Sequence, residues 1–314
     1  MMTKLQGLKS YAYLDHYICV LHLEFPIALA LLNIFAVMGS VSAVLPTGRQ
    51  DFMDYFTVGW ANDHVTLLDN GTCVQLKLDN QSGSGFVTTK SYLYGYVSMD
   101  IRLARGDSSG SITSFYLSSV YEPHEELDFE FLGSSLGQPI ILQTNVFANG
   151  SGGREQRFNL WFDPTLNFHS YSIIWNRQQI IFYVDYMPIR VYKNKVGVPY
   201  PNKGPMLVYA TLYDGDSWAT DGGQTKMNWS SGPFVASYTN FFVDACQWCN
   251  ESSSLLVPSL CSLLQSTLWW DGVNYQTLNA SDQVLLHNIR SKHLIYDYCA
   301  DTNRYPIIPQ DCLP

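Results

Sequence analysis

Three acidic residues at alternate positions are the most chemically suggestive feature of the sequence. Residues 124–131 read His-Glu-Glu-Leu-Asp-Phe-Glu-Phe. Side chains of a β-strand alternate between its two faces, so Glu126, Asp128 and Glu130 would project from one face, with His124 in line. The apolar residues among them would project from the other face, into a core. Neighbouring carboxylates repel one another and are poor strand formers, so a purely structural reason for this arrangement is hard to find.

The spacing of the two outer glutamates fits the cleavage of a glycosidic bond. Residues i and i+4 of a strand lie about 13 Å apart. Two Glu side chains that reach toward each other can bring their carboxyl groups to the ~5–5.5 Å of a retaining glycosidase. One glutamate would attack the anomeric carbon, and the other would protonate the leaving oxygen and later deprotonate the acceptor. Asp128 could bond to one carboxylate and keep the two glutamates in different ionisation states.

The acidic strand could also be a solvated edge strand with acidic gatekeepers, or a calcium site. The apolar residues on the opposite face argue against an edge strand. A zinc site at Cys246 and Cys249 would need a second closely spaced pair of ligands, which the sequence does not offer. We therefore expect neither a metal ion nor a cofactor.

The elements that must position this strand are short and alternate in hydrophobicity from residue 44 to residue 245. Turn residues separate them, and no long helical period lies between them. This pattern is typical of an all-β sandwich or barrel. The clearest predicted strands are 74–78, 94–103, 114–118, 173–176 and 180–184, with a hairpin turn at 176–179.

The composition changes at Cys246, which marks the start of a predicted C-terminal extension, residues 246–314. Residues 281–292 have the apolar spacing of a short helix, with Asn279 or Ser281 as its N-cap. Five of the seven cysteines fall in this extension. Clustered cysteines in a secreted chain indicate disulfides.

The N-terminal segment, residues 1–43, reads as a cleaved signal peptide. Two lysines precede an apolar run at 25–38, and small residues at 39–43 supply a cleavage site. An uncleaved membrane anchor is the alternative, but the run is short for a membrane span. Six Asn-X-Ser/Thr sequons agree with secretion. They begin at Asn70, Asn80, Asn149, Asn228, Asn250 and Asn279.

The charge and the aromatic content restrict the class of ligand. The formal net charge is −9, which argues against nucleic acid or an anionic membrane as a partner. Charged residues make up only 14% of the chain, whereas it holds 8 Trp, 21 Tyr and 16 Phe. Aromatic faces and neutral hydrogen-bonding groups suit a neutral polymer such as a polysaccharide. We take a monomer as the default expectation.

A long ordered series of motifs carries a family resemblance. The motifs are Glu-Leu-Asp-Phe-Glu-Phe-Leu-Gly at 126–133, Gln-Thr-Asn-Val-Phe at 143–147, Arg-Glu-Gln at 154–156, Leu-Trp-Phe-Asp-Pro-Thr at 160–165, Pro-Ile-Arg at 188–190, Trp-Ala-Thr at 218–220, and 295–306 with Cys312. Over nearly all of residues 44–314 the chain resembles the xyloglucan endotransglucosylase/hydrolases of glycoside hydrolase family 16. The resemblance implies a curved antiparallel jelly roll with a groove across its concave sheet, residues 44–245, followed by the extension on the acceptor side.

The same resemblance implies an activity and a location. A member of this family would cleave the β-1,4-glucan backbone of xyloglucan with retention and transfer it to a xyloglucan or oligosaccharide acceptor in the plant cell wall. Hydrolysis of the same glycosyl-enzyme is the alternative reaction. A non-catalytic glucan-binding wall protein is a less favoured alternative, because all three carboxylates are present.

The resemblance also assigns roles to single residues. Glu126 is expected to be the nucleophile, Asp128 its helper and Glu130 the acid/base. The expected glucan contacts are Gln143, Thr144, Asn145, Arg154 and Glu155. The expected acceptor-side contacts are Trp218, Gly222 and Arg304, although Trp218 could equally be a core aromatic. The expected disulfides are Cys246–Cys261 and Cys299–Cys312. This leaves Cys73 and Cys249 either free or bonded to each other, and Cys249 could also compete with Cys246 for Cys261.

The chain departs from the family pattern at several positions. Glu125 stands where the family has Asp, which preserves the acidic character. Ser134 stands where a glycosylated Asn is common. Asp221 replaces an Arg on the acceptor side, and Tyr213-Asp214 replaces Trp-Asn. These changes put the acceptor preference in question, and the sequence does not fix the ratio of transfer to hydrolysis.

Overall fold

The protein is described by a computed structural model that covers residues 51–248 and 268–313. The predicted signal peptide and the predicted Cys246–Cys261 disulfide involve residues outside these ranges, as does Cys249. Among the described residues, no helix is long and apolar enough to cross a membrane.

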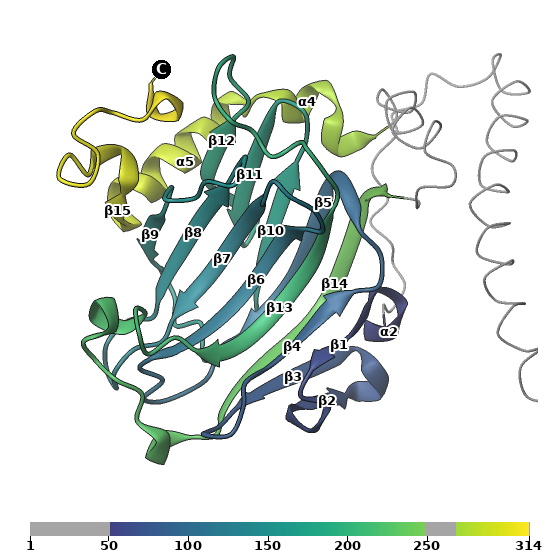
Figure 1. The fold of residues 1–314 in the computed structure, drawn as a ribbon, viewed down its shortest axis with the longest axis vertical. Coiled ribbons are helices and arrows are strands. Elements are labelled where there is room, and N and C mark those ends of the chain that lie inside the picture. Colours follow the sequence, from purple (N-terminus) through teal and green to yellow (C-terminus); the bar gives the residue numbers. More distant parts are fainter. Residues whose placement is uncertain (1–50, 249–267, 314) are drawn as a thin grey trace, which may run out of the picture. The chain divides into compact units, whose positions relative to one another are not determined.

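The regular structure of the described chain consists mainly of fifteen β-strands, and three short α-helices accompany them (Figure 1). The strands are β1 (Phe56–Trp60), β2 (Val65–Leu68), β3 (Cys73–Leu78), β4 (Ser84–Thr88), β5 (Tyr92–Arg102), β6 (Ser111–Ser119), β7 (Glu126–Leu132), β8 (Ile141–Phe147), β9 (Gln156–Asn159), β10 (His169–Trp175), β11 (Gln179–Val184), β12 (Met187–Lys193), β13 (Met206–Asp214), β14 (Phe234–Gln247) and β15 (Leu294–Asp297). The helices are α2 (Phe52–Tyr55), α4 (Val273–Gln276) and α5 (Ala280–His293).

The strands form two antiparallel layers. One layer has the order β1-β4-β13-β6-β7-β8-β9-β15, and the other has the order β2-β3-β14-β5-β10-β11-β12. A single pairing, Met206 with Tyr92, joins β13 of the first layer to β5 of the second. The alternating sequence predicts an all-β sandwich or barrel, and the structure is a sandwich, as the family resemblance implies. The carboxylate strand β7 lies in the middle of the first layer, with hydrogen-bonded neighbours on both sides (Figure 1).

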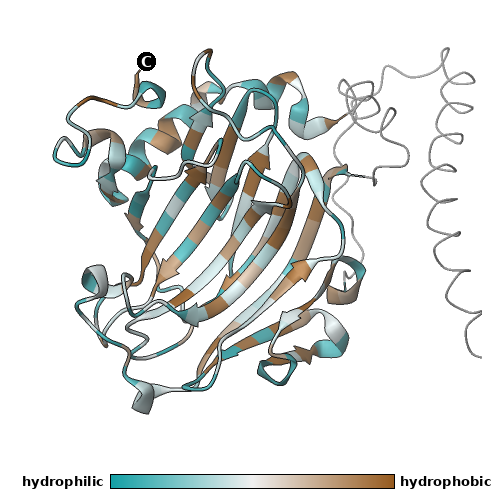
Figure 2. Cartoon of the chain, viewed as in Figure 1, coloured by the Kyte–Doolittle hydropathy of each residue, from teal (hydrophilic) through white to brown (hydrophobic). Residues whose placement is uncertain are grey.

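Strict alternation of side chains builds the core between the two layers. Leu127, Phe129 and Phe131 of β7 are fully or almost fully buried. The ring of Phe129 packs edge-on against Phe182 of β11, and the ring of Phe131 packs edge-on against Tyr171 of β10. Figure 2 shows hydrophobic and hydrophilic residues alternating along the strands. One face of the first layer therefore anchors the sandwich, and its other face is free to bear polar groups.

The helix and the hairpin turn predicted from sequence are both present. Helix α5 begins after Asn279, whose side-chain Oδ1 accepts a hydrogen bond from the backbone N–H of Asp282 at 2.9 Å. Asn279 is therefore the N-cap, and Ser281 lies within the helix. Strands β10 and β11 are joined by a turn at 176–178, where Asn176 Oδ1 accepts from the N–H groups of Gln178 and Gln179.

The C-terminal extension is fastened to the first layer by a strand and by a disulfide. Strand β15 pairs antiparallel with β9 and extends the sheet by one strand. Cys299 and Cys312 form the predicted disulfide, with their Cα atoms 5.5 Å apart. Cys73 is a free, half-buried thiol, so the alternative Cys73–Cys249 bond is not formed.

Candidate active site

The three carboxylates of β7 share the face that points away from the core. Across the sheet, Glu126 pairs with Ser118, Asp128 with Tyr116 and Glu130 with Ser114, all on β6. They lie in a cavity of about 290 Å³. The cavity is lined by the three carboxylates together with Trp60, Ser114, Tyr116, Thr211 and Tyr213.

The surroundings of Glu130 favour its protonated form. Burial raises its pKa to about 7, the negative charge of Glu126 adds to this, and a hydrogen bond from Gln143 opposes it. Burial, followed by the charges of Glu126 and Glu130, also raises the pKa of Asp128 well above its usual range. Since like charges so close together cannot all ionise freely, the strand holds at least one proton at mildly acidic pH.

A chain of hydrogen bonds reaches Glu130 from two neighbouring strands. Gln143 of β8 donates from Nε2 to Glu130 Oε2 at 2.8 Å. Arg157 of β9 donates from Nε to Gln143 Oε1 at 2.7 Å. The guanidinium thereby fixes the orientation of the Gln143 amide, which presents its N–H₂ to the carboxylate. Gln143 pairs with Glu130 across the sheet and therefore lies on the same face as the carboxylates.

Thr144 lies on the opposite face of the sheet from the carboxylates. It pairs with Phe129, and its side chain is 0% exposed. Its Oγ1 accepts a hydrogen bond at 2.9 Å from Arg190, which is itself almost fully buried. The geometry therefore argues against direct contact between its side chain and a glucan. Alternation along β8 separates Thr144 from Gln143 and Asn145.

Asn145 and Arg154 form a buried support beside the carboxylates. Asn145 pairs with Asp128, and its Oδ1 accepts from the backbone N–H of Arg154 at 3.0 Å and of Val146 at 2.9 Å. The Arg154 side chain donates from Nε to Asp311 Oδ2 at 2.8 Å. Arg154 is therefore held by the C-terminal extension and turned from the carboxylates toward it.

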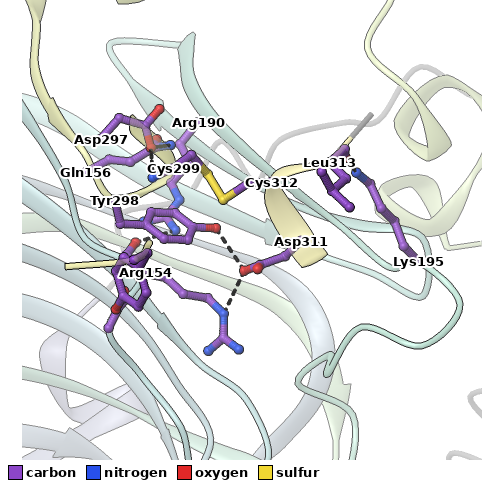
Figure 3. The surroundings of a disulfide bond; sticks show 12 residues. Arg154, Gln156, Arg190, Lys195, Asp297, Tyr298, Cys299, Asp311, Cys312 and Leu313 are labelled. Carbon is purple, nitrogen blue, oxygen red and sulfur yellow. Dashed lines mark hydrogen bonds and ion pairs between the residues drawn. A yellow bond between two sulfur atoms is a disulfide. The ribbon is translucent and has the colours of Figure 1, made fainter. Parts of the chain in front are cut away.

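The carboxylate of Asp311 connects Arg154 to the residues beside the disulfide. Tyr298 donates its hydroxyl hydrogen to Asp311 Oδ2 at 2.8 Å. Figure 3 shows Arg154 and Tyr298 directed at Asp311, next to the Cys299–Cys312 bond. A second cavity, of about 360 Å³, lies beside this disulfide and away from the carboxylates. The disulfide thus restrains the residues on either side of the Asp311 carboxylate.

Comparison with known proteins decides the family. Residues 52–231 match the glycosyl hydrolases family 16, and residues 265–312 match the xyloglucan endo-transglycosylase (XET) C-terminus. The chain is 47% identical over 280 residues to a probable xyloglucan endotransglucosylase/hydrolase protein 5 of Arabidopsis thaliana, covering 88% of this chain and 92% of that one. It is 46% identical over 282 residues to a xyloglucan endotransglucosylase protein 2 of Diospyros kaki, with the same coverage. The chain belongs to the xyloglucan endotransglucosylase/hydrolase family.

The solved structures agree with this assignment at the level of the fold. A laminarinase from Flavobacterium sp. UMI-01 superposes with a TM-score of 0.50 at 16% identity, covering 63% of this chain and 96% of that chain. The jelly-roll sandwich of this chain is therefore the fold of that laminarinase as well.

Two of the predicted glucan contacts of this xyloglucan endotransglucosylase/hydrolase, Glu155 and Arg304, form an ion pair. Arg304 Nη1 lies 2.7 Å from Glu155 Oε2. The guanidinium of Arg304 also lies over the ring of Tyr305, 5.2 Å from its centroid. The charge of Glu155 contributes to the raised pKa of Glu130, which places the pair within electrostatic reach of the carboxylates.

The motif that was expected to bind the acceptor follows β13 and includes the 3₁₀ turn Thr220–Gly223. Trp218 packs on a small hydrophobic cluster with Ile112 and Leu132. Gly222 adopts φ +66 within the 3₁₀ turn Thr220–Gly223, and a Cβ there would meet nothing within 4 Å. Asp221 accepts a hydrogen bond from the Thr225 hydroxyl at 2.5 Å. The structure therefore gives Trp218 a packing role, whereas Gly222 is open to the surface.

Several cavity residues were not singled out from the sequence. Tyr116, Ser114 and Thr211 reach the carboxylates only through strand pairing, β6 with β7 and β13 with β6. The hairpin order of β6 and β7 could have indicated Tyr116, but the β13 pairing joins residues far apart in the chain. Within residues 51–248 and 268–313, no cluster of His, Cys, Asp or Glu is arranged to hold a metal ion.

Proposed function

We propose that this protein is a xyloglucan endotransglucosylase. The Glu126 carboxylate attacks the anomeric carbon of a β-1,4-linked backbone glucose, and Glu130 donates its proton to the leaving oxygen. A glycosyl-enzyme ester then links the donor half to Glu126. In the second step Glu130 takes the proton of an acceptor hydroxyl, whose oxygen attacks the same carbon and releases Glu126.

The raised pKa of Glu130, on the same strand and the same face as a second glutamate, is the observation that carries the assignment. A pKa of about 7 leaves Glu130 protonated at the mildly acidic pH of a plant cell wall. The names of relatives at 46–47% identity support xyloglucan as the polymer for both donor and acceptor.

Secretion into the cell wall accompanies this activity in the proposal. The five sequon asparagines in the described ranges are all exposed. The Cys299–Cys312 disulfide agrees with an oxidising compartment. The signal peptide predicted over residues 1–43 would direct the chain there. We propose that it acts as a glycosylated monomer without a cofactor.

Incubation of xyloglucan with labelled xyloglucan oligosaccharides tests the reaction class. We expect the label to enter high-molecular-mass polymer, and Glu126→Ala to abolish incorporation. If viscosity falls equally with and without the oligosaccharide and no label enters polymer, the reaction is hydrolysis. Full activity of Glu126→Ala would contradict the catalytic assignment itself.

A further inference from the structure

An exposed tryptophan shares the cavity of the three carboxylates, which we take as part of the proposed substrate groove. Trp60, the last residue of β1, lines their cavity and is 42% exposed. Strand pairing places it in one row across the sheet, Trp60 with Gly85, Gly85 with Thr211, Thr211 with Ser114, and Ser114 with Glu130. The three residues between the two ends have small side chains. The row is therefore a trough with an aromatic ring at one end and the acid/base at the other.

A β-bulge is what turns this ring into the groove. Phe56 and Val58 pair opposite the core-facing positions Thr88 and Phe86 of β4. Strict alternation would therefore place Trp60 on the core face too. The pairing shifts by one residue between Val58 and Trp60, so that Trp60 comes opposite a groove-facing position. Bulges next to active sites re-aim side chains in this way.

The ring also needs the glycine beneath it. A Cβ built on Gly85 would lie 2.3 Å from both Cη2 and Cζ3 of Trp60. The six-membered part of the indole therefore rests directly on the backbone of β4. The ring packs on the backbone with one side and is partly exposed on the other. It therefore offers an apolar surface to a ligand and is not simply part of the core.

The chain beyond Trp60 is anchored by an ion cluster around a buried histidine. Four residues on, His64 ends the 3₁₀ turn Asn62–His64 and is only 5% exposed. Its Nδ1 lies 3.1 Å from Asp63 Oδ1, and its Nε2 lies 3.1 Å from Asp79 Oδ1. Two facing carboxylates favour the imidazolium, which carries a proton on both nitrogens. Lys77 is the other charged group here, with Nζ 3.1 Å from Asp79 Oδ2.

Asp79 connects this cluster to the strand under the ring. It follows β3, and its Oδ1 also accepts hydrogen bonds from the backbone N–H of Gln81 at 2.9 Å and of Ser82 at 3.3 Å. These residues form the turn that leads into β4, the strand that carries Gly85. His64 therefore holds together the two segments that must stay in register for the ring to rest on Gly85.

We propose that Trp60 is a glucan-stacking residue of the groove and that His64 is its positioning residue. The inference rests on the proposed function, since the ligand is a pyranose ring of the xyloglucan backbone. The C–H face of a β-linked glucose is apolar and carries no charge, so it gains from burial against an aromatic ring. Three separate features position this ring: the β-bulge of β1, the absence of a side chain at Gly85, and the ion cluster around His64.

Steady-state kinetics of Trp60→Ala tests the stacking role. We expect kcat/KM for xyloglucan to fall by about tenfold or more, mostly through KM, because an anchoring aromatic ring is lost while the chemistry is intact. Trp60→Phe should retain most of the activity. Trp229→Ala is the matched control, since Trp229 is 38% exposed and packs on Phe234 outside the cavity. An unchanged KM in Trp60→Ala, or an equal loss in Trp229→Ala, would overturn the proposal.

A double-mutant cycle tests the positioning role. His64→Gln removes the charge and should raise KM in the otherwise unaltered protein, but should have no further effect on KM in the Trp60→Ala background. Additive effects would overturn the positioning role. If His64→Gln fails to fold, Asp63→Asn removes one exposed carboxylate and should raise KM in the same direction, again only while Trp60 is present.

The outcomes also separate this inference from the proposed function. An unaltered protein that neither cleaves nor transfers xyloglucan would overturn the proposed function and this inference with it. An active protein whose KM is the same after Trp60→Ala would overturn the inference alone.

Discussion

At the scale of single residues, the raised pKa of Glu130 follows from what surrounds its carboxyl group. Glu130 is enclosed and its pKa is raised, while Gln143 donates to the same carboxylate and opposes that rise. Arg157 fixes the Gln143 amide and adds a positive charge nearby. Burial therefore raises the pKa of Glu130, whereas Gln143 and Arg157 both lower it.

Removal of the Arg157 charge is expected to move the alkaline limb of the pH–rate profile upward. Both the charge and the relayed hydrogen bond favour the ionised form of Glu130, so Arg157→Met should raise its pKa above about 7. The measurement is kcat/KM for xyloglucan against pH. Arg105→Met, at an exposed arginine that donates to the Thr165 carbonyl, should leave the limb in place. A limb displaced to lower pH by Arg157→Met would refute this account.

Alternation alone was enough to predict which residues of β7 face the groove. It could equally have set Thr144 apart from Gln143 and Asn145, because these three are consecutive on one strand. The sequence motif gave all three the same expected role, whereas the structure places Thr144 on the core face and the other two on the carboxylate face. Arg157 could not be found from the sequence, since its importance depends on pairing with β8 and on one amide orientation.

At the scale of elements, the Cys299–Cys312 disulfide restrains the residues that hold Arg154 and Asn145 beside the carboxylates. Cys299 follows Tyr298 and Cys312 follows Asp311, and these two neighbours meet at one carboxylate that also binds Arg154 (Figure 3). The backbone of Arg154 in turn holds Asn145. The C-terminal extension is therefore coupled to β8 through side chains as well as through the β9–β15 pairing.

Replacement of Cys299 by serine should lower both stability and acceptor use. The bond closes a loop with a sequence separation of 13. Its loss should therefore reduce the free energy of unfolding by about 3 kcal/mol in the chain-entropy picture. Denaturant unfolding measures this, and Cys73→Ser at the free thiol is the control. We also expect transfer to oligosaccharide acceptors to weaken more than cleavage of the donor, and an equal loss of both would contradict a specific acceptor role.

The His64 cluster should give the β1–β4 region a pH-dependent stability. A contact with Asp79, followed by one with Asp63, raises the pKa of His64 above its usual value of about 6.5. Its stabilisation is fully present below that usual value and is lost as pH rises through the raised folded pKa. The pKa of Asp79 is lowered, so its share is lost only in strong acid.

The comparison of thermal midpoints against pH checks this sign. The difference between the unaltered protein and His64→Gln should be largest near pH 5–6 and should shrink toward alkaline pH. A gap that widens as pH rises would mean that His64 is neutral in the folded protein.

The elements that were predicted have a local signal. Helix α5 has its cap at Asn279, and the β10–β11 hairpin has its turn at Asn176. The bulge that redirects Trp60 has no such signal, because the alternation of β1 reads as an ordinary strand through Trp60. Its position is set by the partner strand β4, which the sequence of β1 does not specify.

At the scale of the whole molecule, the charge of the protein and its proposed substrate make an unusual pair. The chain carries a net charge of −9, and the charged side chains that line the cavity are the three carboxylates. Xyloglucan is neutral, so its binding involves no ion pair and releases no counterions. Recognition must then come from rings such as Trp60 and from neutral hydrogen-bonding groups such as Ser114 and Thr211.

This predicts a reaction that hardly depends on salt. Without charge pairing to screen, kcat/KM for xyloglucan should change by less than about twofold between ~0.05 M and ~0.5 M sodium chloride. A carboxymethylated β-1,4-glucan is the informative comparison, because the net charge repels it and salt should improve its use as a donor. A steep fall in kcat/KM for xyloglucan with salt would show that a charged pair contributes to binding. The Arg304–Glu155 pair, which is half exposed at the arginine, would then be the first place to look.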